Sequence, residues 1–115
     1  MTDVVMTQGE IADKLTICEL KLAHGLDCDI QGLTENCMVK NEDIDELRMI
    51  NTAHWEEVET IHEAFDIPGS VSDDELLLAF KHSHTLNRQR IAVKNRINAA
   101  FGQSQEEKTW KRSTI

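Results

Sequence analysis

The sequence has no tyrosine, a single proline, three phenylalanines and two tryptophans among its 115 residues. With so few aromatic rings the core must be aliphatic, and a stacking platform for single-stranded nucleic acid is not expected. No run of about 20 apolar residues occurs, so no membrane span is predicted. The composition predicts one ordered, helix-rich domain over residues 1–115, with flexible or loosely packed tails at 1–6 and 103–115.

Cysteine is scarce and its number is odd. Cys18, Cys28 and Cys37 form no CxxC motif, and any pair among them leaves one thiol over. The opening "MTDVVMTQGE" has neither the basic region nor the apolar core of a secretory leader. We therefore expect a cytoplasmic protein with reduced thiols, in which Cys18 behaves as a small buried hydrophobic residue.

The motifs of common catalytic and cofactor sites are also missing. There is no Walker loop, dinucleotide fingerprint or nucleophile elbow, so we predict no catalytic residues and no cofactor, and an enzyme is not favoured. Glu59 and His62 have the ExxH spacing of di-iron bundles, but the second ExxH that such sites require is lacking. His82 and His84 are two residues apart and point to different helix faces, so no metal site is predicted.

The net charge of −9 is unevenly distributed along this acidic chain. Residues 1–79 carry four basic and nineteen acidic groups, whereas residues 80–115 carry eight basic and two acidic groups. This division favours a basic last helix packed among acidic neighbours. The alternative is a basic surface for an anionic partner, which the surrounding acidic field would oppose, so nucleic acid is not expected to bind.

Periodicity predicts where the first helix lies. "TQGE" has the spacing of a capping box, in which the Thr7 hydroxyl accepts from the Glu10 amide. Apolar residues then recur at steps of three and four, and Gly25 suits the end of the helix. We therefore predict a helix over about 8–24. Residues 26–40 fit either a short, poor helix or a packed loop.

Two further long helices are predicted. The first is expected to be capped by Asn41 and to end at "IPGS". The second is expected to start at Ser72 or Asp73 and to end at Gly102. No segment has the period of a strand. The predicted fold is an all-α antiparallel helical bundle of three long helices plus a short irregular helix. The seam positions of the middle helix have heptad-like spacing and are Ile44, Leu47, Asn51, His54, Val58, Ile61 and Phe65.

Several polar residues lie within or beside these predicted seams. Buried amide and guanidinium groups need partners, so Asn51, Asn87 and Arg90 must pair with other groups, reach water or bind a ligand. Asp13 and Glu19 are available acceptors. One interpretation is a network between helices that fixes their register; the other is a pocket for a small anionic, phosphate-like or sugar-like ligand. The candidate ligand-binding residues are Lys14, Glu19, Asn51, Glu59, Asn87, Arg90 and Lys94.

Three blocks, "GEIADKLTICELKL", "IDELRMINTAHWEEVE" and "LNRQRIAVKNRINAAFGQSQEEK", resemble an uncharacterised bacterial domain-of-unknown-function family. Its pattern reads GE-x-x-DK-[IL]-TI-x-E-x-K, and later N-x-x-R-x-x-[IL]-K-x-x-IN. The resemblance implies an all-helical fold and no established activity. Cys18 and His54 depart from the family's usual residues. The matching positions, most of them polar, are Gly9, Glu10, Asp13, Lys14, Thr16, Glu19, Lys21, Asn51, Trp55, Glu59, Asn87, Arg90, Lys94, Asn98, Gly102, Ser104, Glu107 and Lys108.

Two functional hypotheses follow from the sequence. The first is a small cytoplasmic interaction or accessory protein that acts as a homo-oligomer or with a protein partner. The second is a small-ligand-binding protein or minor enzyme with a polar pocket between helices.

Overall fold

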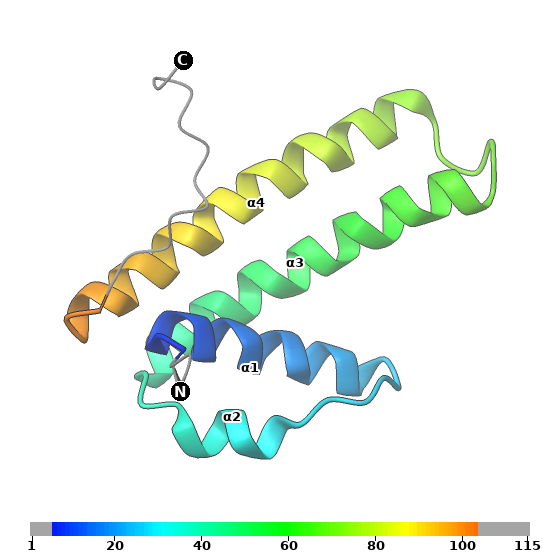
Figure 1. Cartoon of the computed structure of the whole chain (residues 1–115). Helices are drawn as coiled ribbons and strands as arrows, with labels where there is room; N and C mark the ends of the chain where they lie inside the picture. The colour runs from blue at the N-terminus through cyan, green and yellow to red at the C-terminus, as the bar shows by residue number, and fades with distance from the viewer. Residues whose placement is uncertain (1–5, 104–115) are drawn as a thin grey trace, which may run out of the picture.

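The computed structural model describes residues 6–103, which form four α-helices and no strand (Figure 1). They are α1 (Gln8–Ala23), α2 (Ile30–Asn36), α3 (Asn41–Asp66) and α4 (Asp73–Ala100). The two longest, α3 and α4, form an antiparallel hairpin; α1 packs against one half of it and α2 packs on α1 (Figure 1). The predicted all-α bundle of three long helices and a short one is confirmed. None of the described helices is both long and apolar enough to cross a lipid bilayer.

The helix ends follow the predicted signals with one exception. The Thr7 hydroxyl accepts from the Glu10 amide at 3.2 Å, and the Ser72 hydroxyl accepts from the Glu75 amide at 3.1 Å. Gly25 and Gly102 adopt positive φ just after α1 and α4, as helix-ending glycines do. The prediction that Asn41 caps α3 is wrong. Lys40 occupies that position without a side-chain hydrogen bond, and Asn41 is the first helical residue.

The hydrophobic core lies in one half of the hairpin, which we call the proximal half (residues 41–54 and 86–100). The distal half (residues 55–66 and 73–85) extends beyond α1 (Figure 1). Ala79 is the only buried hydrophobic residue of the distal half. Phe65, predicted to be a seam residue, is 70% exposed there. The central cluster joins the proximal half to α1 and to the segment before α3, and consists of Ala12, Val39, Leu47, Ile50, Val93 and Ile97.

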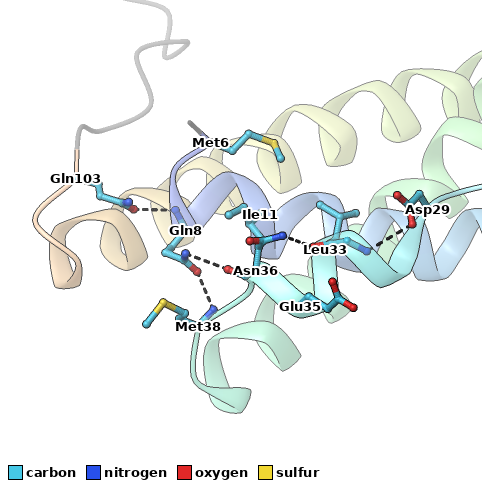
Figure 2. A pocket seen from close by; sticks show the side chains of 10 residues that line it. Met6, Gln8, Ile11, Asp29, Leu33, Glu35, Asn36, Met38 and Gln103 are labelled. Atoms are coloured by element: carbon cyan, nitrogen blue, oxygen red, sulfur yellow. Dashed lines mark hydrogen bonds between the residues drawn. The ribbon is translucent and has the colours of Figure 1, made fainter. Parts of the chain in front are cut away.

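Gln8, at the start of α1, hydrogen-bonds to the end of α2, to the segment that follows it and to Gln103. The Gln8 side chain donates to the Asn36 carbonyl at 3.2 Å and accepts from the Met38 amide at 2.8 Å (Figure 2). Its backbone N–H donates to Gln103 Oε1 at 2.7 Å. Met6 and Gln103 are the described parts of the predicted tails. Residues 1–5 and 104–115, including Trp110, lie outside the described residues.

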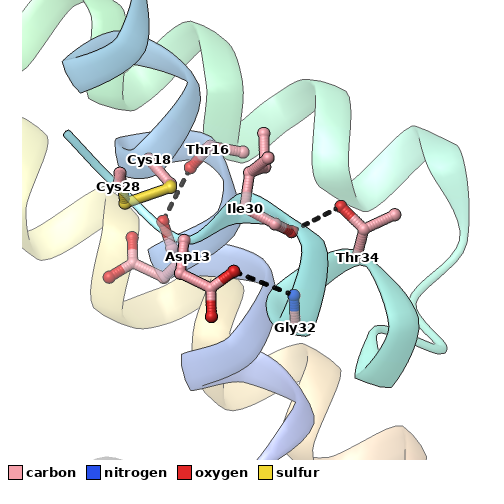
Figure 3. Close-up of a disulfide and its surroundings, with 8 residues drawn as sticks. Asp13, Thr16, Cys18, Cys28, Ile30, Gly32 and Thr34 are labelled. Carbon is pink, nitrogen blue, oxygen red and sulfur yellow. Dashed lines mark hydrogen bonds between the residues drawn. A yellow bond between two sulfur atoms is a disulfide. The ribbon is translucent and has the colours of Figure 1, made fainter. Parts of the chain in front are cut away.

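A disulfide joins Cys18 of α1 to Cys28 in the segment before α2 (Figure 3). The prediction of three reduced thiols is therefore wrong, although Cys37 is free. Cys18 is fully buried, as predicted. Sequence alone did not reveal the pair because the bond requires the chain to turn back at Gly25, which brings residues ten positions apart to a Cα–Cα separation of 5.6 Å.

Gly9 permits the close approach of α1 to the end of α4. Its backbone N–H donates to Asn98 Oδ1 at 2.7 Å, and Asn98 is almost completely buried. A Cβ atom added at Gly9 would lie 2.5 Å from the Lys94 carbonyl oxygen and 2.6 Å from Asn98 Oδ1. Both separations are shorter than real Cβ contacts, so any side chain at this position forces the helices apart.

We expect Gly9→Ala to lower the free energy of unfolding by about 1–3 kcal/mol, because the added methyl overpacks this helix crossing. Urea unfolding followed by circular dichroism measures the change. Gly32→Ala is the matched control: an added Cβ there meets only Asp29 at 3.4 Å, an ordinary contact. Equal stability of the Gly9→Ala and wild-type proteins would show that the helices do not approach so closely.

Candidate functional site

A buried polar cluster lies where α1 crosses α3 and α4. The Asp13 side chain is at its centre and only 7% exposed. Asn51 Nδ2 donates to Asp13 Oδ1 at 3.0 Å and to Thr16 Oγ1 at 2.7 Å. The Thr16 hydroxyl in turn donates to the Asp13 carbonyl at 2.9 Å (Figure 3). These contacts satisfy the Asn51 amide and fix the register of α1 against α3.

Two cations of α4 share the same carboxylate. Arg90 Nε lies 3.8 Å from Asp13 Oδ1, and Lys94 Nζ lies 3.7 Å from Asp13 Oδ2. The Lys94 side chain is only 8% exposed, so its charge needs compensation within the protein. Asp13 supplies that compensation and thereby links α1 to α4 as well as to α3.

The other predicted site residues are more widely spread. Lys14 is exposed, although it directly follows the buried Asp13 on α1. Glu59 is exposed on α3, and Asn87 is half-buried three residues before Arg90. Glu19 accepts from Arg48 at 2.8 and 3.1 Å, so its charge pairs with an arginine of α3. The structure therefore brings Asn51, Arg90 and Lys94 together, and places Lys14, Glu19, Glu59 and Asn87 around or outside this centre.

A cleft of about 430 Å³ opens beside the cluster, between the end of α1 and the middle of α3. Asn51 and Arg90 belong to both the cluster and the cleft, so the cluster forms part of the cleft wall. The apolar lining residues are Ile17, Leu20, Trp55 and Val58. The remaining polar lining residues are His54, Glu59 and His62.

Two buried N–H groups at this cleft have no hydrogen-bond acceptor among the described residues. They are Trp55 Nε1 and Arg90 Nε. The Trp55 ring stacks on His24, with centroids 4.6 Å apart, so the indole is held at the end of α1. Buried donors without acceptors cost free energy and are uncommon in folded proteins. Their presence beside one cleft distinguishes it from the rest of the described surface.

A second cleft, of about 570 Å³, lies between the start of α1 and α2 (Figure 2). Its wall includes Gln8, Asn36 and Gln103, which hydrogen-bond to one another or to nearby backbone. The charged lining residues are the carboxylates Asp29 and Glu35. Because its polar groups are already paired, this cleft is a junction of chain segments and a poorer candidate for an anionic ligand.

His54 and Ser83 connect α3 to α4 through a contact of 2.9 Å between His54 Nε2 and the Ser83 hydroxyl. A serine beside an imidazole can serve nucleophilic catalysis if a third group orients the imidazole and backbone donors stabilise an oxyanion. Ser83 lies in the middle of α4, where the backbone N–H groups are engaged in helical hydrogen bonds. The contact is better suited to pairing the two helices than to catalysis.

Sequence reasoning left three buried members of the region out of the candidate list: Asp13, Thr16 and Asn98. Asp13 was expected to act as an acceptor and all three positions matched the family resemblance, but none was predicted to bind a ligand. The spacing of Asp13 and Thr16 places both on one helix face. Asn98 lies four residues after Lys94, on the stripe that carries Arg90. Helical spacing could thus have identified all three as neighbours. Among the described residues, no group of three His, Cys, Asp or Glu side chains is arranged to hold a metal ion.

We expect Asp13→Ala to lower the free energy of unfolding by about 3–5 kcal/mol, because it leaves the charge of Lys94 buried beside Arg90 without this carboxylate. Glu19→Gln, at a partly exposed ion pair, should cost less than about 1 kcal/mol. Chemical denaturation of both variants measures the difference. Similar losses in the two variants would contradict the central role of Asp13.

Burial lowers the pKa of His54, the positive charge of Arg90 lowers it further, and Asp13 and Glu57 act in the opposite direction. Since the folded-state pKa lies below the ordinary value of 6.5, the unfolded chain binds more protons, and this residue's contribution to stability is lost as the pH falls below 6.5. We expect the loss of melting temperature between about pH 7.5 and about pH 5.5 to be smaller in His54→Gln than in the wild type.

His82→Gln is the control for this pH series. The His82 side chain is 57% exposed, on α4, and lies 3.8 Å from Glu57. Removing it should leave the wild-type loss of melting temperature unchanged. A wild-type pH dependence in His54→Gln would mean that other groups cause the loss.

The sequence matches no family model, and no curated protein or solved structure shows significant similarity to it. The resemblance of the three sequence blocks to a bacterial family therefore stays a prediction.

Proposed function

We propose that this protein acts through protein–protein interaction and self-associates through the distal half of the α3–α4 hairpin. Five large apolar side chains near the turn support this proposal. They are 46–70% exposed, and we call them the tip patch: Phe65, Ile67, Leu77, Leu78 and Phe80. Soluble monomers rarely leave so many large apolar groups exposed in one region, and such groups commonly mark an interaction surface.

The uneven core supports the same proposal. In the distal half the two helices bury one hydrophobic residue, Ala79, and contacts with the end of α1, such as Trp55 on His24, lie at its inner end. Most of the stability of a helix in a protein comes from burying an apolar face, and two helices offer too little surface to bury. A second hairpin placed on the distal half would complete a four-helix arrangement, which is a common and stable one.

Charge limits how a second copy can dock on the distal half. There α3 and α4 carry eight acidic residues and one basic residue, Lys81, since the other four basic residues of α4 lie in the proximal half. Acidic surfaces repel each other, so two copies must meet through the apolar side chains of the tip patch, with their acidic residues turned to solvent. A two-fold arrangement places the same apolar patch on both sides of the interface.

The homo-oligomer predicted from the sequence is thus proposed to form through the tip patch. The cytoplasmic location and the bacterial source stay predictions. Reduced thiols were expected to accompany the cytoplasmic location, and the Cys18–Cys28 disulfide, of a kind that persists mainly in oxidising compartments, speaks against that location.

A second function, binding of a small anionic or sugar-like ligand, is favoured by the cleft between α1 and α3. The observation that supports it is the pair of buried donors, Trp55 Nε1 and Arg90 Nε, that lack acceptors among the described residues. This function does not depend on self-association.

Sedimentation equilibrium tests the self-association. We expect a mass of about twice 13.1 kDa for the wild type and a shift towards 13.1 kDa for the double variant Phe65→Ser, Phe80→Ser, because polar side chains weaken the apolar contact. Met49→Ser is the control, since Met49 is 75% exposed and lies on α3, like Phe65, but in the proximal half. A wild-type monomer at all concentrations, or equal effects of both changes, would overturn the proposal.

A further inference from the structure

The cleft between α1 and α3 combines an apolar wall with a small number of polar groups. Its volume of about 430 Å³ lies in the range of small-molecule sites. Ile17 and Leu20 come from α1 and Val58 from α3, so the apolar wall is built by two helices. A ligand composed only of hydroxyl groups, such as a sugar, would leave this wall without an apolar partner. The lining is better matched by a compact apolar body.

Arg90 supplies the cation of the cleft. Its Nε–H is buried and donates no hydrogen bond among the described residues, and Asp13 Oδ1 lies 3.8 Å away. A carboxylate on a ligand is a natural acceptor for a guanidinium. Trp55 Nε1 is a second donor at the same cleft without an acceptor. Two donors without acceptors favour a ligand that carries an acceptor group.

The carboxylates around Arg90 limit the charge of the ligand. Asp13 already balances part of the positive charge, and Glu59 lies on the cleft wall. A dianion such as phosphate would meet repulsion from both, whereas one negative charge is better tolerated. A single carboxylate therefore suits this surrounding better than a phosphate group.

We propose that the cleft binds a small monocarboxylate with a compact apolar body. Its carboxylate pairs with Arg90, and its body packs against Ile17, Leu20 and Val58. The inference rests on the second proposed function, ligand binding in this cleft, and names the chemical class of that ligand. It is independent of self-association through the tip patch.

A titration with 3-phenylpropionate tests the proposal. The protein carries Trp110→Phe, so that its tryptophan fluorescence comes from Trp55, a wall residue of the cleft. We expect a saturable fluorescence change and a rise in melting temperature with the acid. The uncharged 3-phenylpropionamide should produce neither at the same concentrations. Equal responses to the acid and the amide would overturn the role of the carboxylate.

Variants locate the binding site. Arg90→Gln should weaken binding of the acid by about tenfold or more, because a charged hydrogen bond is lost. Arg88→Gln, an exposed arginine on the same helix, should retain wild-type binding. Val58→Phe adds bulk to the cleft wall and leaves Arg90 in the sequence. It should also abolish binding, which keeps the test decisive if Arg90→Gln fails to fold. Wild-type binding in Val58→Phe, or equal losses in the two arginine variants, would overturn the site.

Inorganic phosphate separates failure of this inference from failure of the second function. If phosphate binds in an Arg90-dependent manner and 3-phenylpropionate does not, the cleft binds anions but the monocarboxylate assignment is wrong. If neither probe binds, both the inference and the binding of a small anionic ligand in this cleft are overturned. Sedimentation of the same samples reports self-association separately.

Discussion

The Asp13 carboxylate is the point at which three helices are held to one another. It is buried on α1, accepts from Asn51 of α3, and lies within 4 Å of Arg90 and Lys94 of α4. A buried carboxylate is costly to desolvate, so such a group is stable only where several partners converge on it. Any sliding or rotation of α1 would separate Asp13 from at least one of them. The position of α1, and with it the cleft beside α3, depends on this one side chain.

Local features of the fold could be predicted from the sequence because they depend on residues close together in the chain. The caps at Thr7 and Ser72 and the helix ends at Gly25 and Gly102 follow from hydrogen-bonding and backbone preferences of single residues. The predicted cap of α3, Asn41, was wrong. Lys40 takes the capping position there without a side-chain contact, so the helix begins for reasons other than its cap.

Partners across the fold could not be predicted in the same way. The sequence offered Asp13 and Glu19 as equivalent acceptors, and only the crossing of α1 over α3 decides that Asn51 reaches Asp13 while Arg48 reaches Glu19. The heptad-like spacing correctly placed Leu47 and Asn51 inside, but it continued to Phe65, which is exposed. Periodicity identifies an apolar face; it does not tell whether the same chain or another molecule covers it.

The confinement of the core to the proximal half has a consequence for local unfolding. Regions with few buried apolar contacts open at a lower free energy than the molecule as a whole. The backbone amides of the distal half therefore exchange their hydrogens through partial opening of the hairpin, while those around Leu47 and Ile97, both almost completely buried, exchange only when the whole domain unfolds. A single chain of this protein thus has two regions of different cooperativity, although α3 and α4 run without interruption through both.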